Sequence, residues 1–198
     1  MPHPKEHKMD RAMPVCNIRA VEGNDRQYTL SFSSEEPYDR YFGTEILDHS
    51  PGAVDLSRLN SIGVVLFNHN RDRVVGRILS AGIKNGRGEA LIEFDDDEES
   101  EKIRKKVAGG TLKGVSVGYS VAVWEEVLKG KKSSDGRFTG PCYIAKKWQP
   151  LEVSIVSVPA DQTVGVGRSD EEPVRSSSAR SYAERLLQIN KNLYERSR

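Results

Sequence analysis

Short runs of apolar and β-branched residues, each bounded by turn-forming residues, recur along most of this chain. Residues 62–67, 74–79 and 89–94 are clear examples, and the first is an almost continuous apolar run, typical of a buried strand. The runs do not alternate with helices in the way that a parallel α/β sheet requires. About eight such runs with one inserted helix predict a mainly β fold with flanking helices, built as an antiparallel barrel or sandwich.

Turn signals join several of these runs into hairpins. Residues 16–21 and 27–32 are strand-like on either side of a turn-forming segment at residues 22–25. Asn85-Gly86 is a strong two-residue hairpin signal between two further runs. Residues 33–48 contain a proline, a glycine and several aromatic residues, and predict a long loop.

Helix signals occur at two places. Ser50-Pro51 offers an N-cap serine followed by proline at the first helical position, which predicts a short helix through Leu59. Residues 95–101 are acidic, residues 102–106 are mostly basic, and Gly109-Gly110 follows them. An acidic run of this kind could also bind a metal or a protein. Acidic residues at the start, basic residues at the end and glycines beyond are nevertheless typical of a well-capped, solvated helix.

Composition divides the chain into three parts. Residues 1–14 are polar and predict a disordered N-terminus, and residues 15–167 form the expected folded domain. Residues 168–198 begin as a serine-containing linker and end in a predicted amphipathic helix. Four apolar residues fall on one face of that helix: Tyr182, Leu186, Ile189 and Leu193.

The charge balance and cysteine content exclude several classes of protein. Lys and Arg number 30 against 29 Asp and Glu, which gives a formal charge of +1 and does not indicate a nucleic-acid partner. No apolar run reaches the length that spans a bilayer, and the first residues lack a secretory signal pattern, so we expect no membrane and an intracellular location. Cys16 and Cys142 form neither a disulfide framework nor a metal-ligand spacing. We therefore expect no cofactor and no metal.

Three residues have the chemistry of a serine hydrolase. Ser116 lies between Gly114 and Gly118, and a serine needs a base to become a nucleophile. His69 ends a predicted strand, and Glu152 lies early in another. The acid in such a site fixes the tautomer of the histidine. The order histidine, serine, acid differs from α/β-hydrolases, in which a histidine follows the serine.

Each of these residues also has an ordinary structural interpretation. The serine could be a strand residue between glycines, the histidine a loop residue in a polar turn, and Glu152 a solvated strand end. His49 competes with Glu152 for the third position, because a second histidine can orient the first. A carboxylate orients an imidazole more strongly through a charge-assisted hydrogen bond, which favours Glu152.

Taken together, three segments resemble the prohead (capsid maturation) serine proteases of tailed bacteriophages. They are residues 67–70 around His69, residues 113–119 around Ser116, and residues 151–160, which begin Leu-Glu-Val-Ser. The resemblance spans roughly residues 15–166 and implies an antiparallel β-barrel of the kind found in herpesvirus assemblins. It also implies that Ser116 is the nucleophile, His69 the base and Glu152 the acid, although the second histidine of assemblins keeps His49 open.

The family's function sets the remaining expectations. Such enzymes lie inside the immature capsid in the host cytoplasm, where they cleave scaffold protein or the scaffolding segment of the major capsid protein, and usually themselves. Residues 15–167 would then be the protease domain, and cleavage near residues 168–180 would release the tail. Whether a homodimer is needed stays open. The alternative is a catalytically silent internal scaffold or capsid-binding protein.

Overall fold

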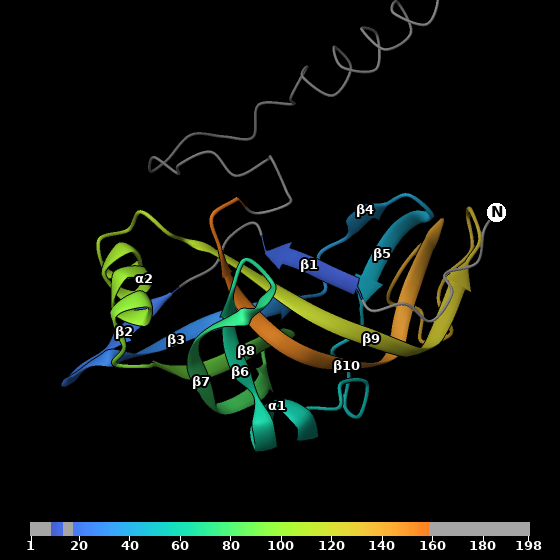
Figure 1. Ribbon diagram of the computed structural model, residues 1–198. Helices are drawn as coiled ribbons and strands as arrows, with labels where there is room; N and C mark the ends of the chain where they lie inside the picture. The colour runs from blue at the N-terminus through green and yellow to red at the C-terminus, as the bar shows by residue number, and fades with distance from the viewer. Residues whose placement is uncertain (1–8, 14–17, 159–198) are drawn as a thin grey trace, which may run out of the picture. The chain divides into compact units, whose positions relative to one another are not determined.

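The computed structural model describes residues 9–13 and 18–158, which form one mainly β unit (Figure 1). The chain divides into residues 1–165 and 166–198, and all described residues belong to the first unit. The predicted linker and terminal helix at residues 168–198 therefore lie outside the described residues. The elements are β1 (Met9–Met13), β2 (Arg19–Val21), β3 (Asn24–Ser34), β4 (Tyr38–Arg40), β5 (Gly43–Leu47), α1 (Ser57–Ile62), β6 (Val64–Phe67), β7 (Asn70–Lys84), β8 (Arg87–Phe94), α2 (Glu98–Ala108), β9 (Gly114–Val127) and β10 (Cys142–Val156).

One sheet contains all the strands. Its main path runs β1-β9-β10-β6-β7-β8-β3-β2, with β5 paired to β10 and β4 paired to β5. Most neighbours are antiparallel, whereas β5 and β6 both run parallel to β10. Among the described residues no pairing joins β1 to β2, so the sheet is not closed, and the prediction of a barrel is not confirmed.

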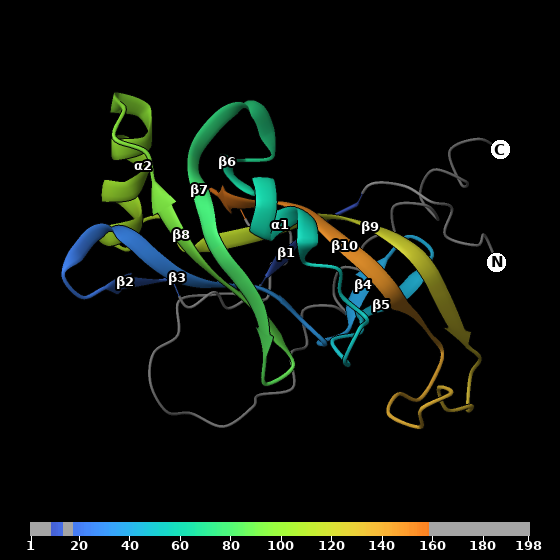
Figure 2. The ribbon, with the colours of Figure 1, turned by 90° about the horizontal axis from the view of Figure 1, so that it is seen from below.

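The longest pairing joins β9 to β10, which lie side by side in both views (Figures 1 and 2). The register runs from Cys142 opposite Val127 to Val156 opposite Gly114, with irregularities on the way. Residues 142–156 form one long strand that continues through Pro150. Pro150 does not break this strand, because register irregularities in the ladder lie next to Pro150 and accommodate a residue that has no N–H to donate.

The predicted capped helix is α2. Asp97 is its N-cap, and the Asp97 side chain accepts hydrogen bonds from the backbone N–H groups of Glu99 and Ser100. Acidic residues occupy the first turn and Lys105 and Lys106 the last, which complements the helix dipole. Ile103 is buried toward β7 and β8, against which the helix packs. The solvated, capped helix is therefore the correct interpretation of this acidic run.

Two predicted elements are wrong. Residues 33–48 are not one long loop, because they contain β4 and β5, and β5 gains its stability by pairing with β10. Ser50-Pro51 starts a turn and no helix: Ala53 N–H donates to the Ser50 carbonyl, and Gly52 has a φ of +76°, so proline and glycine sit where a type II turn needs them. The short helix begins later, at Ser57.

The predicted disorder of the N-terminus is wrong for residues 9–13, which form β1. This strand pairs with the free edge of β9, and its Arg11 side chain is buried. A five-residue strand carries little local signal, and its pairing with β9 stabilises it. In the described part of the chain, neither helix has the length and apolar character needed to cross a lipid bilayer.

Candidate active site

The register of three strands gathers the candidate residues on one face of the sheet. Asp10, Gly118 and Glu152 are paired across β1, β9 and β10. In the next row but one, Ser116 on β9 is paired with Ser154 on β10. Residues directly opposite each other point to the same face, as do residues two apart along a strand. Ser116, Ser154 and Glu152 therefore share one face.

His69 reaches this face from the turn between β6 and β7. Phe67 pairs with Asn70, which leaves Asn68 and His69 as a two-residue hairpin turn with φ of +54° and +57°. Positive φ at both positions is the mark of a type I′ turn, and asparagine and histidine are among the non-glycine residues enriched at positive φ. The Asn68 side-chain oxygen accepts a hydrogen bond of 2.9 Å from the backbone N–H of Ser157, which ties the turn to the end of β10.

A continuous chain of hydrogen bonds links the three predicted residues. Ser116 Oγ lies 2.7 Å from His69 Nε2, and His69 Nδ1 lies 2.7 Å from Glu152 Oε1. Because a carboxylate only accepts, Nδ1 carries the proton and Nε2 is left to accept from the serine hydroxyl. The structure thus brings together residues that are 47 and 83 positions apart in the chain.

Ser154 extends the network by contacting both Glu152 and His69. Its hydroxyl donates to Glu152 Oε2 at 2.7 Å and accepts from the backbone N–H of His69 at 3.2 Å. Both oxygens of the carboxylate are therefore engaged, and the histidine is held through its backbone as well as its ring. Such support limits the rotation of groups that must meet within hydrogen-bonding distance.

The electrostatics favour a protonatable imidazole. The hydrogen bond to Glu152 raises the pKa of His69 above its ordinary value, and the negative charges of Glu152 and Asp10 act in the same direction against the opposing effect of burial. Asp10 Oδ1 lies 3.7 Å from His69 Nδ1. The His69 side chain is 26% exposed and Ser116 only 2%, so solvent reaches the imidazole more readily than the hydroxyl.

Gly118 has a steric role in the site. A Cβ at this position would lie 2.5 Å from Glu152 Oε1 and 3.1 Å from Asp10 Oδ1. The absence of a side chain therefore makes room for the carboxylate that contacts His69. A cavity of about 140 Å³ opens beside His69 and Glu152 and is also lined by Met9 and Arg71.

The same residues offer a donor set for a cation. Ligand atoms of Asp10, His69 and Glu152 lie within 4.8 Å of one another. Both ring nitrogens of His69 are already hydrogen-bonded, however, to Ser116 and Glu152. A cation would have to break the bond to Glu152, so this arrangement suits proton transfer better than metal binding.

The structure places His49 elsewhere. Its Nε2 lies 2.7 Å from Ser33 Oγ, its Nδ1 lies 2.8 Å from the Leu47 carbonyl, and its ring packs against Trp148. Burial lowers the pKa of His49, in contrast to His69. Among the described residues Glu152, and not His49, therefore contacts the ring of His69.

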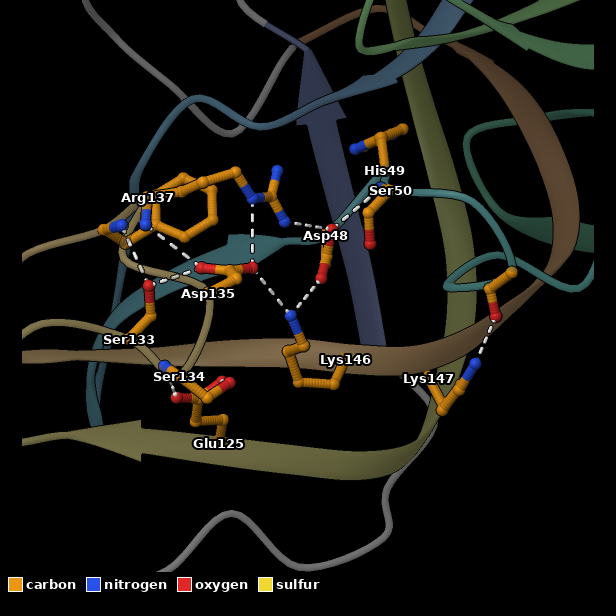
Figure 3. Close-up of polar contacts among 12 residues, drawn as sticks. Asp48, His49, Ser50, Glu125, Ser133, Ser134, Asp135, Arg137, Lys146 and Lys147 are labelled. Carbon is orange, nitrogen blue, oxygen red and sulfur yellow. Dashed lines mark hydrogen bonds and ion pairs between the residues drawn. The ribbon is translucent and has the colours of Figure 1, made fainter.

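A separate ionic cluster lies beside His49 (Figure 3). Arg137, from the segment between β9 and β10, contacts Asp48 Oδ1 at 2.6 Å and Asp135 Oδ2 at 3.0 Å, and Lys146 contacts Asp48 Oδ2 at 2.6 Å. Burial alone would raise the pKa of Asp48, but hydrogen bonds from Lys146, Ser50 and Arg137 outweigh it and lower the pKa to about 2. The two basic and two acidic residues pair with one another, which indicates a structural clamp on this segment.

Sequence reasoning missed two neighbours of the triad. Asp10 was assigned to a disordered terminus, and no local pattern signals that it lies opposite Gly118. Asn68 could have been noticed, since asparagine is among the few residues that tolerate positive φ.

A serine hydroxyl, an imidazole and a carboxylate in this order can carry out acyl transfer. Part of the major capsid protein of Halomonas phage phiHAP-1 is 37% identical to this chain over 147 residues, which are 72% of the chain and 23% of that protein. The chain thus matches less than a quarter of its relative's length. The comparison with solved structures found no match. Residues 16–176 match the family described as caudovirus prohead serine protease, and the chain therefore belongs to that family.

Proposed function

We propose that this protein is a serine endopeptidase of phage prohead maturation, with Ser116 as nucleophile, His69 as general base and Glu152 as the orienting acid. The observation that carries the proposal is the unbroken hydrogen-bond chain, with 2.7 Å from serine to imidazole and 2.7 Å from imidazole to carboxylate. These distances lie within the range in which a base acts directly on a nucleophile. Membership of a serine protease family supports the same roles.

The proposed reaction proceeds in two stages. His69 Nε2 takes the proton of Ser116 Oγ while the oxygen bonds to the carbonyl carbon of a peptide, and the carbonyl electron pair moves to its oxygen. When that intermediate collapses, the C–N bond breaks and the departing amine takes the proton from His69. Water then attacks the acyl-serine with His69 again as base, and the proton returns to Ser116 as the acid product leaves.

Glu152 acts in both stages without changing its own protonation. Its charge stabilises the imidazolium that forms each time His69 accepts a proton, consistent with the raised pKa of His69. Ser154 holds the second carboxylate oxygen, so that the charge stays aimed at Nδ1.

The proposed substrates are scaffold protein or the scaffolding segment of the major capsid protein, within the procapsid in the host cytoplasm. The family description supports a role in the prohead, and the name of the Halomonas phage relative supports a link to the capsid protein. Self-cleavage near residues 168–180 belongs to the same proposal. Mass spectrometry of wild type and Ser116→Ala protein tests it, and masses that differ only by the oxygen atom removed in the substitution would contradict it.

A fluorophosphonate probe, which phosphonylates activated serine hydroxyls, tests the chemistry without knowledge of the substrate. We expect labelling of the wild type, loss of labelling in Ser116→Ala and His69→Ala, and unchanged labelling in Ser80→Ala, where the serine is exposed on β7. Absence of labelling in the wild type and in all variants, including Arg11→Ala and Ala12→Pro in strand β1, would contradict the peptidase proposal. It would favour a catalytically silent scaffold or capsid-binding protein.

A further inference from the structure

The first strand of the chain lies along the edge of β9 that carries Ser116. Residues 9–13 pair antiparallel with residues 115–119, and position 12 is directly opposite Ser116. Extended peptides bind many proteins by adding a strand to such an edge, where the main-chain hydrogen bonds supply affinity and alternate side chains supply specificity. Within the described residues, β1 therefore occupies the position that an extended peptide would take beside the nucleophile.

The burial of the nucleophile agrees with an occupied edge. Ser116 is 2% exposed, although a peptide carbonyl must come into contact with its Oγ for acyl transfer to begin. β1 pairs with a single strand, β9, and lies at one end of the path through the sheet. Leaving the edge would therefore break the ladder on one side only and would leave β9 paired with β10.

One side chain anchors β1. Arg11 points away from the triad face and is 1% exposed. Its Nη2 donates to the Glu36 carbonyl, its Nη1 lies 3.6 Å from Glu45 Oε1, and its guanidinium lies 5.2 Å from the centre of the Tyr38 ring. A carboxylate, a carbonyl and an aromatic face form a pocket that suits a cation.

This pocket remains satisfied when Arg11 leaves it. Glu45 is fully buried, but it also pairs with Arg40 at 3.2 Å and accepts a hydrogen bond from the Tyr119 hydroxyl. Arg11 is less well satisfied: its Nε is buried without a partner in the described structure, and burial lowers its pKa. Without Arg11 the buried Glu45 therefore still has a cationic partner, whereas the occupied pocket leaves Arg11 Nε without a hydrogen-bond partner among the described residues.

We propose that the edge of β9 at residues 114–119 is the peptide-binding site of this protein, that it takes an extended segment with a basic side chain in the Arg11 pocket, and that β1 is the chain's own occupant of the site. The basic residue then lies one position before the residue opposite Ser116. The inference deepens the proposed peptidase function and rests on it: substrate segments displace β1 and take its place.

A binding measurement tests this without any catalysis. The protein is the full chain with Ser116→Ala, and the probe is a fluorescein-labelled peptide that copies residues 8–15. Fluorescence anisotropy gives its dissociation constant. Adding Arg11→Ala to the protein weakens β1, and we expect the peptide to bind about tenfold more tightly, because a larger fraction of molecules has an open edge. Arg26→Ala, which removes an exposed ion pair with Asp96, is the matched control and leaves the affinity unchanged.

Two further measurements keep the test decisive. Ala12→Pro introduces into β1 a residue that strands disfavour, without touching the pocket, and it replaces Arg11→Ala if that variant does not fold. A peptide with alanine in place of its arginine is expected to bind at least about tenfold more weakly, equivalent to one lost charge-assisted contact. Equal affinity of the two peptides, or no gain from weakening β1, would overturn the inference.

The two proposals fail separately. Arginine-dependent peptide binding by a chain that no fluorophosphonate labels would refute the peptidase and leave the binding site in place. A different pair of results would refute the proposal that β1 occupies the peptide-binding edge and leave the peptidase proposal in place. In that case the fluorophosphonate labels the protein no faster in Arg11→Ala or Ala12→Pro, and the peptide binds equally well with or without its arginine.

Discussion

Replacing Gly118 with alanine tests whether the position of Glu152 matters. In the structure, the new Cβ would lie 2.5 Å from Glu152 Oε1, whereas ordinary contacts of a Cβ begin near 3.4 Å. The carboxylate oxygen that now shares a 2.7 Å hydrogen bond with the imidazole must therefore move by about 0.9 Å. We expect this displacement to break the bond, because a lengthening of that size exceeds the usual limit of about 3.2 Å for a hydrogen bond of this type.

The expected loss follows from the size of this displacement. A misplacement of about 1 Å in a catalytic group costs on the order of 100-fold in rate, or about 2.8 kcal/mol. We expect no comparable loss of stability, because the atom that must move lies at the end of a side chain. In addition, alanine in a strand is favoured over glycine by about 0.5–1 kcal/mol. We therefore expect Gly118→Ala to label about 100-fold more slowly with a fluorophosphonate, while its melting temperature stays within about 4 °C of the wild type.

The control is the same substitution elsewhere in the sheet. Gly82 lies in β7, and a Cβ there would meet no atom within 4 Å. Gly82→Ala should label at the wild-type rate. If Gly118→Ala labels as fast as Gly82→Ala, the contact between the carboxylate and the imidazole is not needed, and the assignment of Glu152 as orienting acid is refuted.

The labelling rate should rise with pH through the pKa of His69, and Glu152→Gln should move this midpoint to lower pH, because the hydrogen bond and charge of Glu152 raise the pKa of His69; an unmoved midpoint would contradict this. Asn68→Ala should lower the free energy of unfolding in urea by about 1–2 kcal/mol, since it combines a positive φ with loss of the bond to Ser157, and Asn68→Gly should lose less. Because the pKa of Asp48 is lowered to about 2, its contribution to stability is present above its ordinary pKa and is lost as pH falls toward 2. Asp48→Asn should therefore flatten the acid side of the stability profile, and an unchanged slope would contradict the role of that ionic cluster.

Local signals predicted those elements whose stability is local. Helix α2 carries its own N-cap, dipole-matched charges and terminal glycines, and the Asn85-Gly86 turn has positive φ at both residues, which a type I′ hairpin requires. Both were predicted from sequence and confirmed. The apolar run that ends at Phe67 was likewise predicted as a strand, because its side chains can only be satisfied in a core.

Strands that depend on a distant partner were missed. β1 and β5 are short, and each is held by pairing to a strand about one hundred residues away in the chain. For the same reason, the meeting of Ser116, His69 and Glu152 was an expectation drawn from family resemblance, since no local pattern encodes a register across three strands. The neighbour Asp10 is invisible without that register.

Strand β10 sets the positions of all three site residues relative to one another. It pairs with β9, which bears Ser116, and with β6, which leads into the turn of His69, while it carries Glu152 itself. A slip of one residue along either ladder would turn a required side chain to the opposite face. In a newly made chain in which either ladder is incomplete, the Ser116 hydroxyl thus lacks the imidazole and carboxylate that would activate it. Completion of the sheet therefore sets the earliest moment at which the proposed peptidase could cleave a peptide bond, including one in a neighbouring protein synthesised at the same time.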